Sequence, residues 1–183
     1  MDSLEGLLLV ASPRLPDPNF YRSVVLIIQH DKQGAFGLIL NRPTENTVEE
    51  IWEMIGEQPC DNDQSINLGG PVGGPLLALH DNSECSEREI LPGVHFATHK
   101  DHLNQLVADP MNTLRIYTGY SGWGAGQLEG EMKIGGWMTL PASSDYIFGD
   151  AEGMWKRAAQ AIGEDVTGPL VSRAGVPGDP GFN

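Results

Sequence analysis

The segment at residues 119–131, GYSGWGAGQLEGE, constrains the fold of this chain more than any other. Glycines at positions 122, 124 and 126 alternate with other residues, and two large aromatic side chains, Tyr120 and Trp123, lie among them. Chains use glycine this densely where the backbone turns sharply or approaches another segment closely. The segment therefore predicts a glycine-rich loop of defined structure, with Tyr120 and Trp123 anchored in the core.

Short apolar runs rich in branched side chains predict the strands. Residues 6–11 and 23–29 show the continuous pattern of buried strands, and a tight hairpin at 30–34 leads into a third strand at 35–41. Gly37 within that third strand indicates a bulge or a close backbone neighbour. The same criteria predict further strands at 66–68, 76–80, 114–118 and 137–140.

Capping residues and apolar spacing predict the helices. Thr47 and Glu50 form a capping box before a short amphipathic helix that ends at Gly56. Thr98 is expected to cap a second helix that runs to about residue 108, and a short helix is expected at 126–132. Asp150 is expected to cap the last helix. The strands occur in runs rather than in strict alternation with helices, which predicts an α+β fold.

Length and charge limit the organisation and the partners. The 183 residues fit one compact domain at 1–165, followed by a flexible Gly/Pro-rich tail at 166–183. A net charge of −14, from 25 acidic and 11 basic residues, disfavours direct binding to nucleic acid. Membrane spans need about 20 consecutive apolar residues, and no run approaches that length. We expect a cytoplasmic protein that does not span a membrane.

Two enzymatic patterns are present only in part. Ser121 stands where the nucleophile of a hydrolase would, after a strand, but Trp123 occupies the place of the second small residue and no histidine follows His102. A hydrolase that uses Ser121 or the carboxylate of Glu129 is therefore the alternative hypothesis. A dinucleotide-binding loop would need glycine where Gln127 stands, so no cofactor is expected.

Three histidines, His95, His99 and His102, raise the question of a metal site. His99 and His102 are i, i+3 neighbours at the start of the second predicted helix, which is close enough to share an ion. No third ligand follows them at helical spacing, and Lys100 lies between them. The sequence therefore predicts no metal site.

Several spaced motifs follow one another along the chain: Ala11-Ser12-Pro13 with Asp17, FYRSV at 20–24, GAFGLILNRP at 34–43, GGPV at 69–72 and the glycine-rich segment from Gly119 to Glu129. Together they resemble the YqgE/AlgH family of bacterial proteins. The resemblance implies a compact α+β domain built on a bent or bifurcated mixed β-sheet with flanking short helices. It implies no catalytic residues, because no activity is established for the family, although some members are labelled transcriptional regulators.

The leading functional hypothesis is a non-enzymatic regulatory or binding module. The glycine-rich turns fall at predicted strand ends, where loops gather and binding residues are common. We expect these turns to converge into a shallow site for an unknown small molecule or a protein partner. The expected site residues are Arg22, Asn41, Arg42, Gly69, Gly70, Tyr120, Trp123, Gln127 and Glu129.

Overall fold

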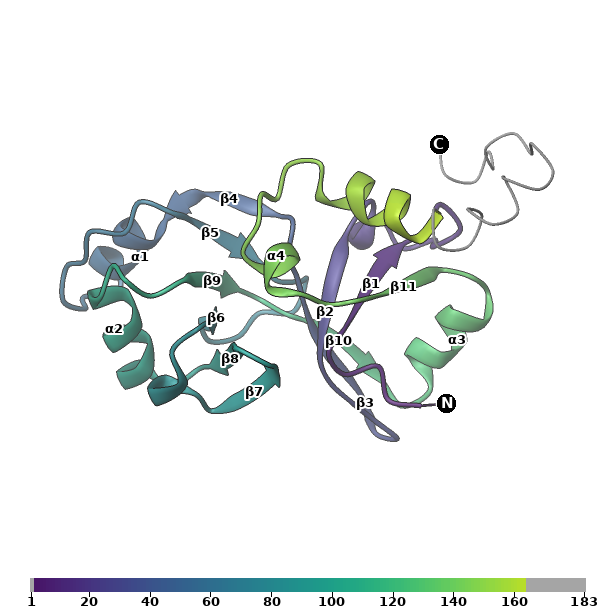
Figure 1. The fold of residues 1–183 in the computed structure, drawn as a ribbon, viewed down its shortest axis with the longest axis horizontal. Helices are drawn as coiled ribbons and strands as arrows, with labels where there is room; N and C mark the ends of the chain where they lie inside the picture. The colour runs from purple at the N-terminus through teal and green to yellow at the C-terminus, as the bar shows by residue number, and fades with distance from the viewer. Residues whose placement is uncertain (1, 164–183) are drawn as a thin grey trace.

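The computed structural model describes residues 2–163, which form two β-sheets with short helices around them (Figure 1). Within this range the first sheet has the strand order β10-β3-β2-β1-β11 and the second has the order β4-β5-β9-β6-β8-β7. The strands of the first sheet are β1 (Leu7–Ala11), β2 (Val24–Asp31), β3 (Gly34–Ile39), β10 (Ser121–Gly124) and β11 (Trp137–Pro141). Those of the second are β4 (Pro43–Thr47), β5 (Ser65–Leu68), β6 (Leu77–His80), β7 (Arg88–Leu91), β8 (Val94–Ala97) and β9 (Leu114–Thr118).

The helices lie at the two ends of the molecule and on one side of it (Figure 1). They are α1 (Val48–Met54), α2 (Lys100–Ala108), α3 (Gln127–Lys133), α4 (Ser144–Ile147) and a helix at residues 154–163, with short 3-10 turns η1 (Pro18–Phe20) and η2 (Ser83–Cys85). All neighbouring strands are antiparallel except β5 and β9, which are parallel. The expected α+β class with a mixed sheet is confirmed.

The two sheets join where two chain segments cross from one to the other. The chain leaves β3 and enters β4 in the second sheet, and it leaves β9 and enters β10 in the first. Between these crossings the N–H of Ile39 donates to the carbonyl of Gly69 (2.8 Å), and the N–H of Gly69 donates to that of Thr118 (2.9 Å). These bonds continue the ladder from one sheet into the other, as a bifurcated sheet requires.

Glycine is necessary at this junction because two backbones touch there. A Cβ atom on Gly70 would lie 2.1 Å from the backbone carbonyl carbon of Tyr120, and one on Gly69 would lie 2.4 Å from the carbonyl oxygen of Gly119. Gly119 itself has a φ of 73°, which favours glycine. The prediction of a loop was nevertheless wrong for Ser121–Gly124, because this segment pairs with β3 as strand β10.

Strand β2 carries core side chains on both faces. Val24, Leu26 and Ile28 belong to one apolar cluster, which the helix at 154–163 covers with Met154, Ala158, Ala159 and Ile162. Val25 and Ile27 face a second cluster, which includes Phe20, Trp123 and Trp137. The continuous apolar run of β2 follows from this double burial. A third cluster packs α1 and α2 against the second sheet and includes Trp52 and Leu106.

The helix caps were predicted with mixed success. The Thr47 side chain accepts from the N–H of Glu50, as expected for an N-cap. The cap of α2 was predicted wrongly: its N-cap is His99, whose side chain makes no capping bond, and the Glu87 carboxylate accepts the N–H groups of Thr98 and His99 instead. The last helix begins at residue 154 rather than after Asp150. The predicted tail at 166–183 lies outside the described residues.

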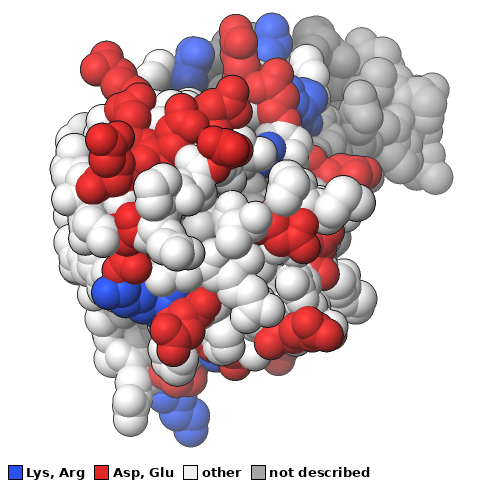
Figure 2. All heavy atoms as spheres, turned by 90° about the vertical axis from the view of Figure 1, so that its left-hand side faces the viewer, with Lys and Arg blue, Asp and Glu red and all other residues white. Residues whose placement is uncertain are grey.

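Acidic side chains outnumber basic ones at the end of the molecule that α1 and α2 form, which faces the viewer in Figure 2. Strand β4, helix α1 and the loop that follows α1 carry the exposed carboxylates of Glu45, Glu49, Glu50, Glu53, Asp61 and Asp63. Among residues 2–163, no helix is long and apolar enough to cross a membrane.

Candidate functional site

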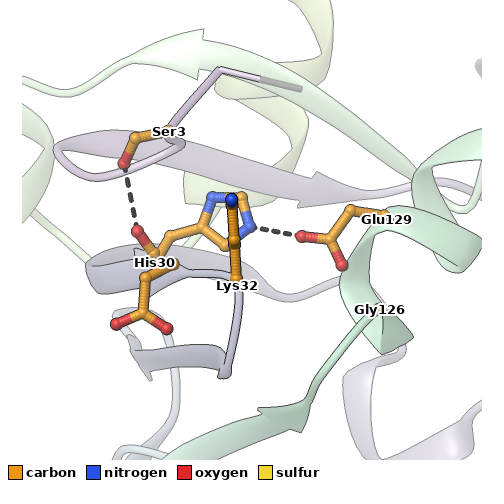
Figure 3. Close-up of a pocket in the computed structure, with 6 residues that line it drawn as sticks. Ser3, His30, Lys32, Gly126 and Glu129 are labelled. Carbon is orange, nitrogen blue, oxygen red and sulfur yellow. Dashed lines mark hydrogen bonds and ion pairs between the residues drawn. The ribbon is translucent and has the colours of Figure 1, made fainter.

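A pocket of about 450 Å³ lies beside the end of β2 and the start of α3 (Figure 3). Its lining comes from the N-terminal segment, from the β2–β3 hairpin and from α3. The residues are Ser3, His30, Asp31, Lys32, Gly126 and Glu129. Because most of them carry a polar or charged group, the pocket is suited to a small polar ligand.

The strand pattern of β2 directs His30 inward. Gln29 and Asp31 are exposed and His30 is buried, so the alternation of the strand places the imidazole between the sheet and α3. The N–H of Leu4 donates to Nδ1 of His30 (3.0 Å), and the N–H of His30 donates to the carboxylate of Glu5 (3.1 Å). These bonds hold the N-terminal segment against the strand and fix the ring.

The pairing of β10 with β3 brings α3 to the same place. Gly124 pairs with Gly34, which in turn pairs with Asp31 at the end of β2. Gly126, with a φ of 76°, then turns the chain into α3. Glu129 lies in the first turn of that helix and thereby reaches His30.

His30 and Glu129 form a short hydrogen bond, with 2.5 Å between Nε2 and Oε1. Because Nδ1 accepts the N–H of Leu4, the ring proton lies on Nε2, which donates to the carboxylate. This bond from His30 is the main reason that the pKa of Glu129 lies below its ordinary value. Glu129 is therefore ionised at neutral pH, and its side chain keeps 27% of its surface exposed toward the pocket.

The pairing of His30 with Glu129 is better suited to binding a ligand than to acid–base catalysis. Both ring nitrogens of His30 are engaged in hydrogen bonds within the protein, so neither is directed at a substrate. A carboxylate whose pKa is lowered is a weak base, whereas general bases work best near neutrality. Glu129 and Asp31 instead offer negative charge to a ligand, and Lys32 offers positive charge.

The serine of the hydrolase hypothesis lies elsewhere. The side chain of Ser121 is fully buried, and its hydroxyl donates to the carbonyl of Gly69 (3.0 Å). In this position the hydroxyl helps to join the two sheets, and none of its surface is exposed to a substrate.

Three of the predicted site residues meet at one loop. Arg42 donates to the carbonyls of Asn19 and Tyr21, and Asn41 bridges the N–H of Val24 and the carbonyl of Arg22. Arg22 has a φ of 52°, which is uncommon outside glycine and asparagine. Its guanidinium lies 5.3 Å from the ring centroids of both Tyr21 and Trp155.

The other predicted residues divide between the sheet junction and α3. Gly69, Gly70 and Tyr120 form the junction, where backbone contacts occupy the space. Trp123 is 5% exposed, and its Nε1 donates to Glu131 (3.3 Å). Gln127 accepts the N–H of Gly124 at the start of α3.

The structure thus brings Arg22, Asn41 and Arg42 together. Gln127 bonds Gly124 and only Glu129 lines the His30 pocket, so the nine residues do not form one site. The other residues that line the pocket were missed: Ser3, His30, Asp31, Lys32 and Gly126. The sequence signal for His30 is that it is flanked by two polar residues, Gln29 and Asp31, at the end of β2, where alternation directs it inward. From the sequence, this segment was assigned only to a hairpin.

The comparisons with known proteins agree over nearly the whole chain. The model of the AlgH-like family matches residues 8–167. A UPF0301 protein of Thermobifida fusca is 39% identical, with 99% of this chain and 96% of that protein covered. A UPF0301 protein of Xanthomonas campestris is 40% identical, with 89% of this chain and 91% of that protein covered.

Two solved structures share the fold. The solution structure of the AlgH protein from Pseudomonas aeruginosa has a TM-score of 0.73 and 29% sequence identity, and the match covers 97% of this chain and 99% of that one. A crystal structure of a protein from Corynebacterium diphtheriae has a TM-score of 0.68 at 22% identity, with 88% of each chain covered, which supports the fold alone. On these matches, the chain belongs to the AlgH-like family.

Proposed function

We propose that the protein is a non-enzymatic cytoplasmic binding module with a regulatory role, and that the pocket beside His30 and Glu129 binds a small molecule with an ammonium or guanidinium group. The observation that carries this proposal is the Glu129 carboxylate, which is ionised, held in place by His30 and directed into a pocket of about 450 Å³.

The charges around the pocket favour a cationic group. Asp31 adds a second carboxylate at the rim, and the net charge of −14 attracts small cations from solution. Lys32 lies on the same rim and is placed to pair with a carboxylate of the ligand. Amino acids and related zwitterions carry both groups, so they are the ligand class that fits best. The same negative charge disfavours nucleic acid as the partner.

Thermal unfolding in the presence of candidate ligands tests the proposal. The panel contains amino acids, polyamines, guanidino compounds and, as controls, neutral amides of the same size. A ligand present at about 100 times its dissociation constant adds about 2.7 kcal/mol to the free energy of unfolding, which raises Tm measurably. We expect cationic compounds to raise Tm and the neutral amides to have no effect.

Two variants locate the binding. Glu129→Gln keeps the shape of the side chain and removes its charge. Because hydrogen bonds to charged groups contribute about 1.5–3 kcal/mol, this change should lower the affinity for a cationic ligand about 10-fold or more. Glu89→Gln changes an exposed carboxylate on β7 and serves as the matched control. Equal binding to both variants, or no cationic ligand in the panel, would refute the proposal.

A further inference from the structure

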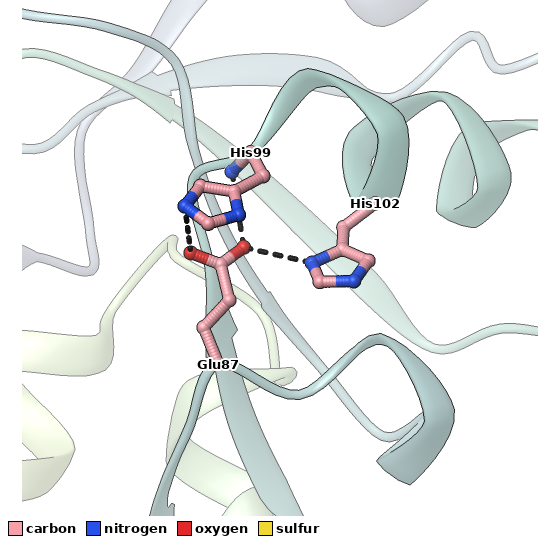
Figure 4. Close-up of side chains that lie close together, drawn as sticks. All are labelled: Glu87, His99 and His102. Atoms are coloured by element: carbon pink, nitrogen blue, oxygen red, sulfur yellow. Dashed lines mark hydrogen bonds and ion pairs between the residues drawn. The ribbon is translucent and has the colours of Figure 1, made fainter.

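A second group of side chains lies on the other sheet, away from the His30 pocket. Glu87, which directly precedes β7, meets His99 and His102 at the start of α2 (Figure 4). One ligand atom from each of the three lies within 4.8 Å of the others. The sequence offers no third ligand at helical spacing from the two histidines. The fold supplies one in Glu87, twelve residues before His99.

The distance from Glu87 to His102 matches the donor separation of a metal shell, and the distance from Glu87 to His99 is slightly longer. Oε2 of Glu87 lies 3.0 Å from Nδ1 of His102, and Oε1 lies 3.7 Å from Nε2 of His99. Donors bound to one zinc ion at about 2.1 Å are separated by roughly 3.0–3.4 Å. The two imidazole rings are nearly parallel, at 14° with centroids 5.8 Å apart, and both turn a nitrogen toward the carboxylate (Figure 4).

The carboxylate is held in position before any ion binds. The N–H groups of Thr98 (2.7 Å) and His99 (3.0 Å) donate to its Oε2, and the hydroxyl of Thr98 donates to its Oε1 (3.1 Å). Carboxylate ligands in metal sites are commonly oriented by hydrogen bonds of this kind. Capping the helix requires only the backbone bonds, and it does not account for two histidines turned toward the same group.

The local charges favour a cation. Burial alone would raise the pKa of Glu87, but hydrogen bonds with His102, His99 and Thr98 hold it below its ordinary value. The carboxylate is therefore ionised at neutral pH. Lys100, which lies between the histidines in sequence, is ion-paired with Glu57 and does not occupy the site.

The site is open on one side. The side chain of Glu87 is 17% exposed, that of His102 is 31% exposed and that of His99 is 72% exposed. An ion can enter from the His99 side without any rearrangement of the backbone, and His99 is free to adjust its rotamer. Three protein ligands leave at least one coordination position for water or for a ligand from solution.

We propose that Glu87, His99 and His102 bind a divalent transition-metal ion of the zinc class. Two imidazoles and one carboxylate suit Zn²⁺, Co²⁺ and Ni²⁺, whereas Mg²⁺ and Ca²⁺ prefer oxygen ligands. The bound ion links the segment before β7 to the start of α2, which the helix cap already connects. This site is separate from the pocket of the proposed function, and neither depends on the other.

Titration of the untagged, full-length, metal-free protein with Zn²⁺ by calorimetry tests the proposal. We expect one ion per chain, and no comparable heat from Mg²⁺. Metal binding should also shift the NMR signals of Nε2 of His99 and Nδ1 of His102, which identifies the coordinating atoms, while the ring of His30 should be unaffected.

The variants are chosen so that the helix cap survives. His99→Asn removes an exposed imidazole and places a preferred N-cap residue at the start of α2, and His102→Gln leaves both backbone bonds to Glu87 in place. Loss of a hydrogen bond to a metal ligand lowers metal affinity about 10- to 100-fold, and loss of the ligand itself should lower the affinity for Zn²⁺ at least as much. Thr98→Val removes the hydrogen bond from the Thr98 hydroxyl to Glu87 and should lower the affinity for Zn²⁺ about 10-fold.

Glu89→Gln, two residues from Glu87 and exposed, is the control and should bind Zn²⁺ as the unmodified protein does. The proposal is overturned if the unmodified protein binds no Zn²⁺, Co²⁺ or Ni²⁺. It is equally overturned if His99→Asn and His102→Gln, both folded as judged by circular dichroism, bind these ions as tightly as Glu89→Gln does.

Discussion

The buried imidazole of His80 should make the stability of this protein depend on pH. His80 lies on β6 with none of its surface exposed. Its Nδ1 accepts the N–H of Asn82 (3.1 Å), and among residues 2–163 its Nε2 has no hydrogen-bond partner. The folded protein therefore holds this ring in its neutral form, whereas the unfolded chain exposes it to water.

Burial lowers the pKa of His80 from 6.5 to about 4. The stacked ring of His95, 5.7 Å away, and the charge of His102 act in the same direction, and the carboxylates of Asp81 and Glu87 oppose them. Above pH 6.5 the ring is neutral in both states, and its contribution to stability is fully present. As the pH falls from 6.5 toward 4, the unfolded chain binds a proton that the folded protein does not, so stability is lost.

The difference between 6.5 and about 4 corresponds to about 3 kcal/mol. We would measure urea unfolding at pH 7, 6, 5 and 4, with a chelator present, for the unmodified protein and for His80→Asn. Asparagine retains an acceptor for the N–H of Asn82 and does not titrate in this range. The cavity that it leaves lowers stability equally at every pH, so only the slope with pH reports the effect.

We expect the unmodified protein to lose about 3 kcal/mol more than His80→Asn between pH 7 and pH 4. Parallel curves for the two proteins would refute the reasoning. An NMR titration of the ring provides a direct check, because a pKa of His80 near 6.5 in the folded protein would contradict the proposed burial effect even if the unfolding curves differ.

Two further predictions concern the fold, one at the sheet junction and one at a helix cap. Gly70→Ala should destabilise the protein by several kcal/mol, since its Cβ would lie 2.1 Å from the backbone of Tyr120, whereas Gly73→Ala meets nothing within 4 Å and should change the urea midpoint little. Similar midpoints for the two would contradict the junction. Thr47→Ala should cost about 1 kcal/mol in the same assay by removing the bond to the N–H of Glu50; an unchanged midpoint would show that this cap is dispensable.

The sequence predicted correctly the features that depend on residues close together in the chain. The Thr47 cap and the run of β2 follow from residues within one element. Gly37 was correctly interpreted as a close backbone neighbour, because a Cβ there would lie 2.7 Å from the carbonyl oxygen of Leu26, beside an irregularity in the pairing of β2 with β3.

The sequence could not predict the contacts that the fold makes between distant segments. Ser121–Gly124 has the composition of a loop, and only its pairing with β3 makes it a strand. Thr98 is a residue type that commonly caps helices. Here the carboxylate of Glu87, eleven residues earlier, caps α2 by accepting the N–H of Thr98, and the Thr98 hydroxyl also donates to Glu87. Each candidate site was predicted only in part, because each needs a partner from another element. Glu129 was an expected site residue but its partner His30 was not, and His99 and His102 were considered as metal ligands without Glu87.

The sheet junction explains why Gly69 and Gly70, which were expected to bind a ligand, lie outside both candidate sites. At Gly69 and Gly70 the neighbouring backbone already occupies the space of a Cβ atom, so a ligand has no room there. What the junction determines is register: it sets where β10 pairs with β3, and hence where α3 begins and whether Glu129 reaches His30. A change that shifts the junction should therefore weaken binding in the pocket without touching a residue that lines it, whereas a change confined to the pocket should leave the junction intact.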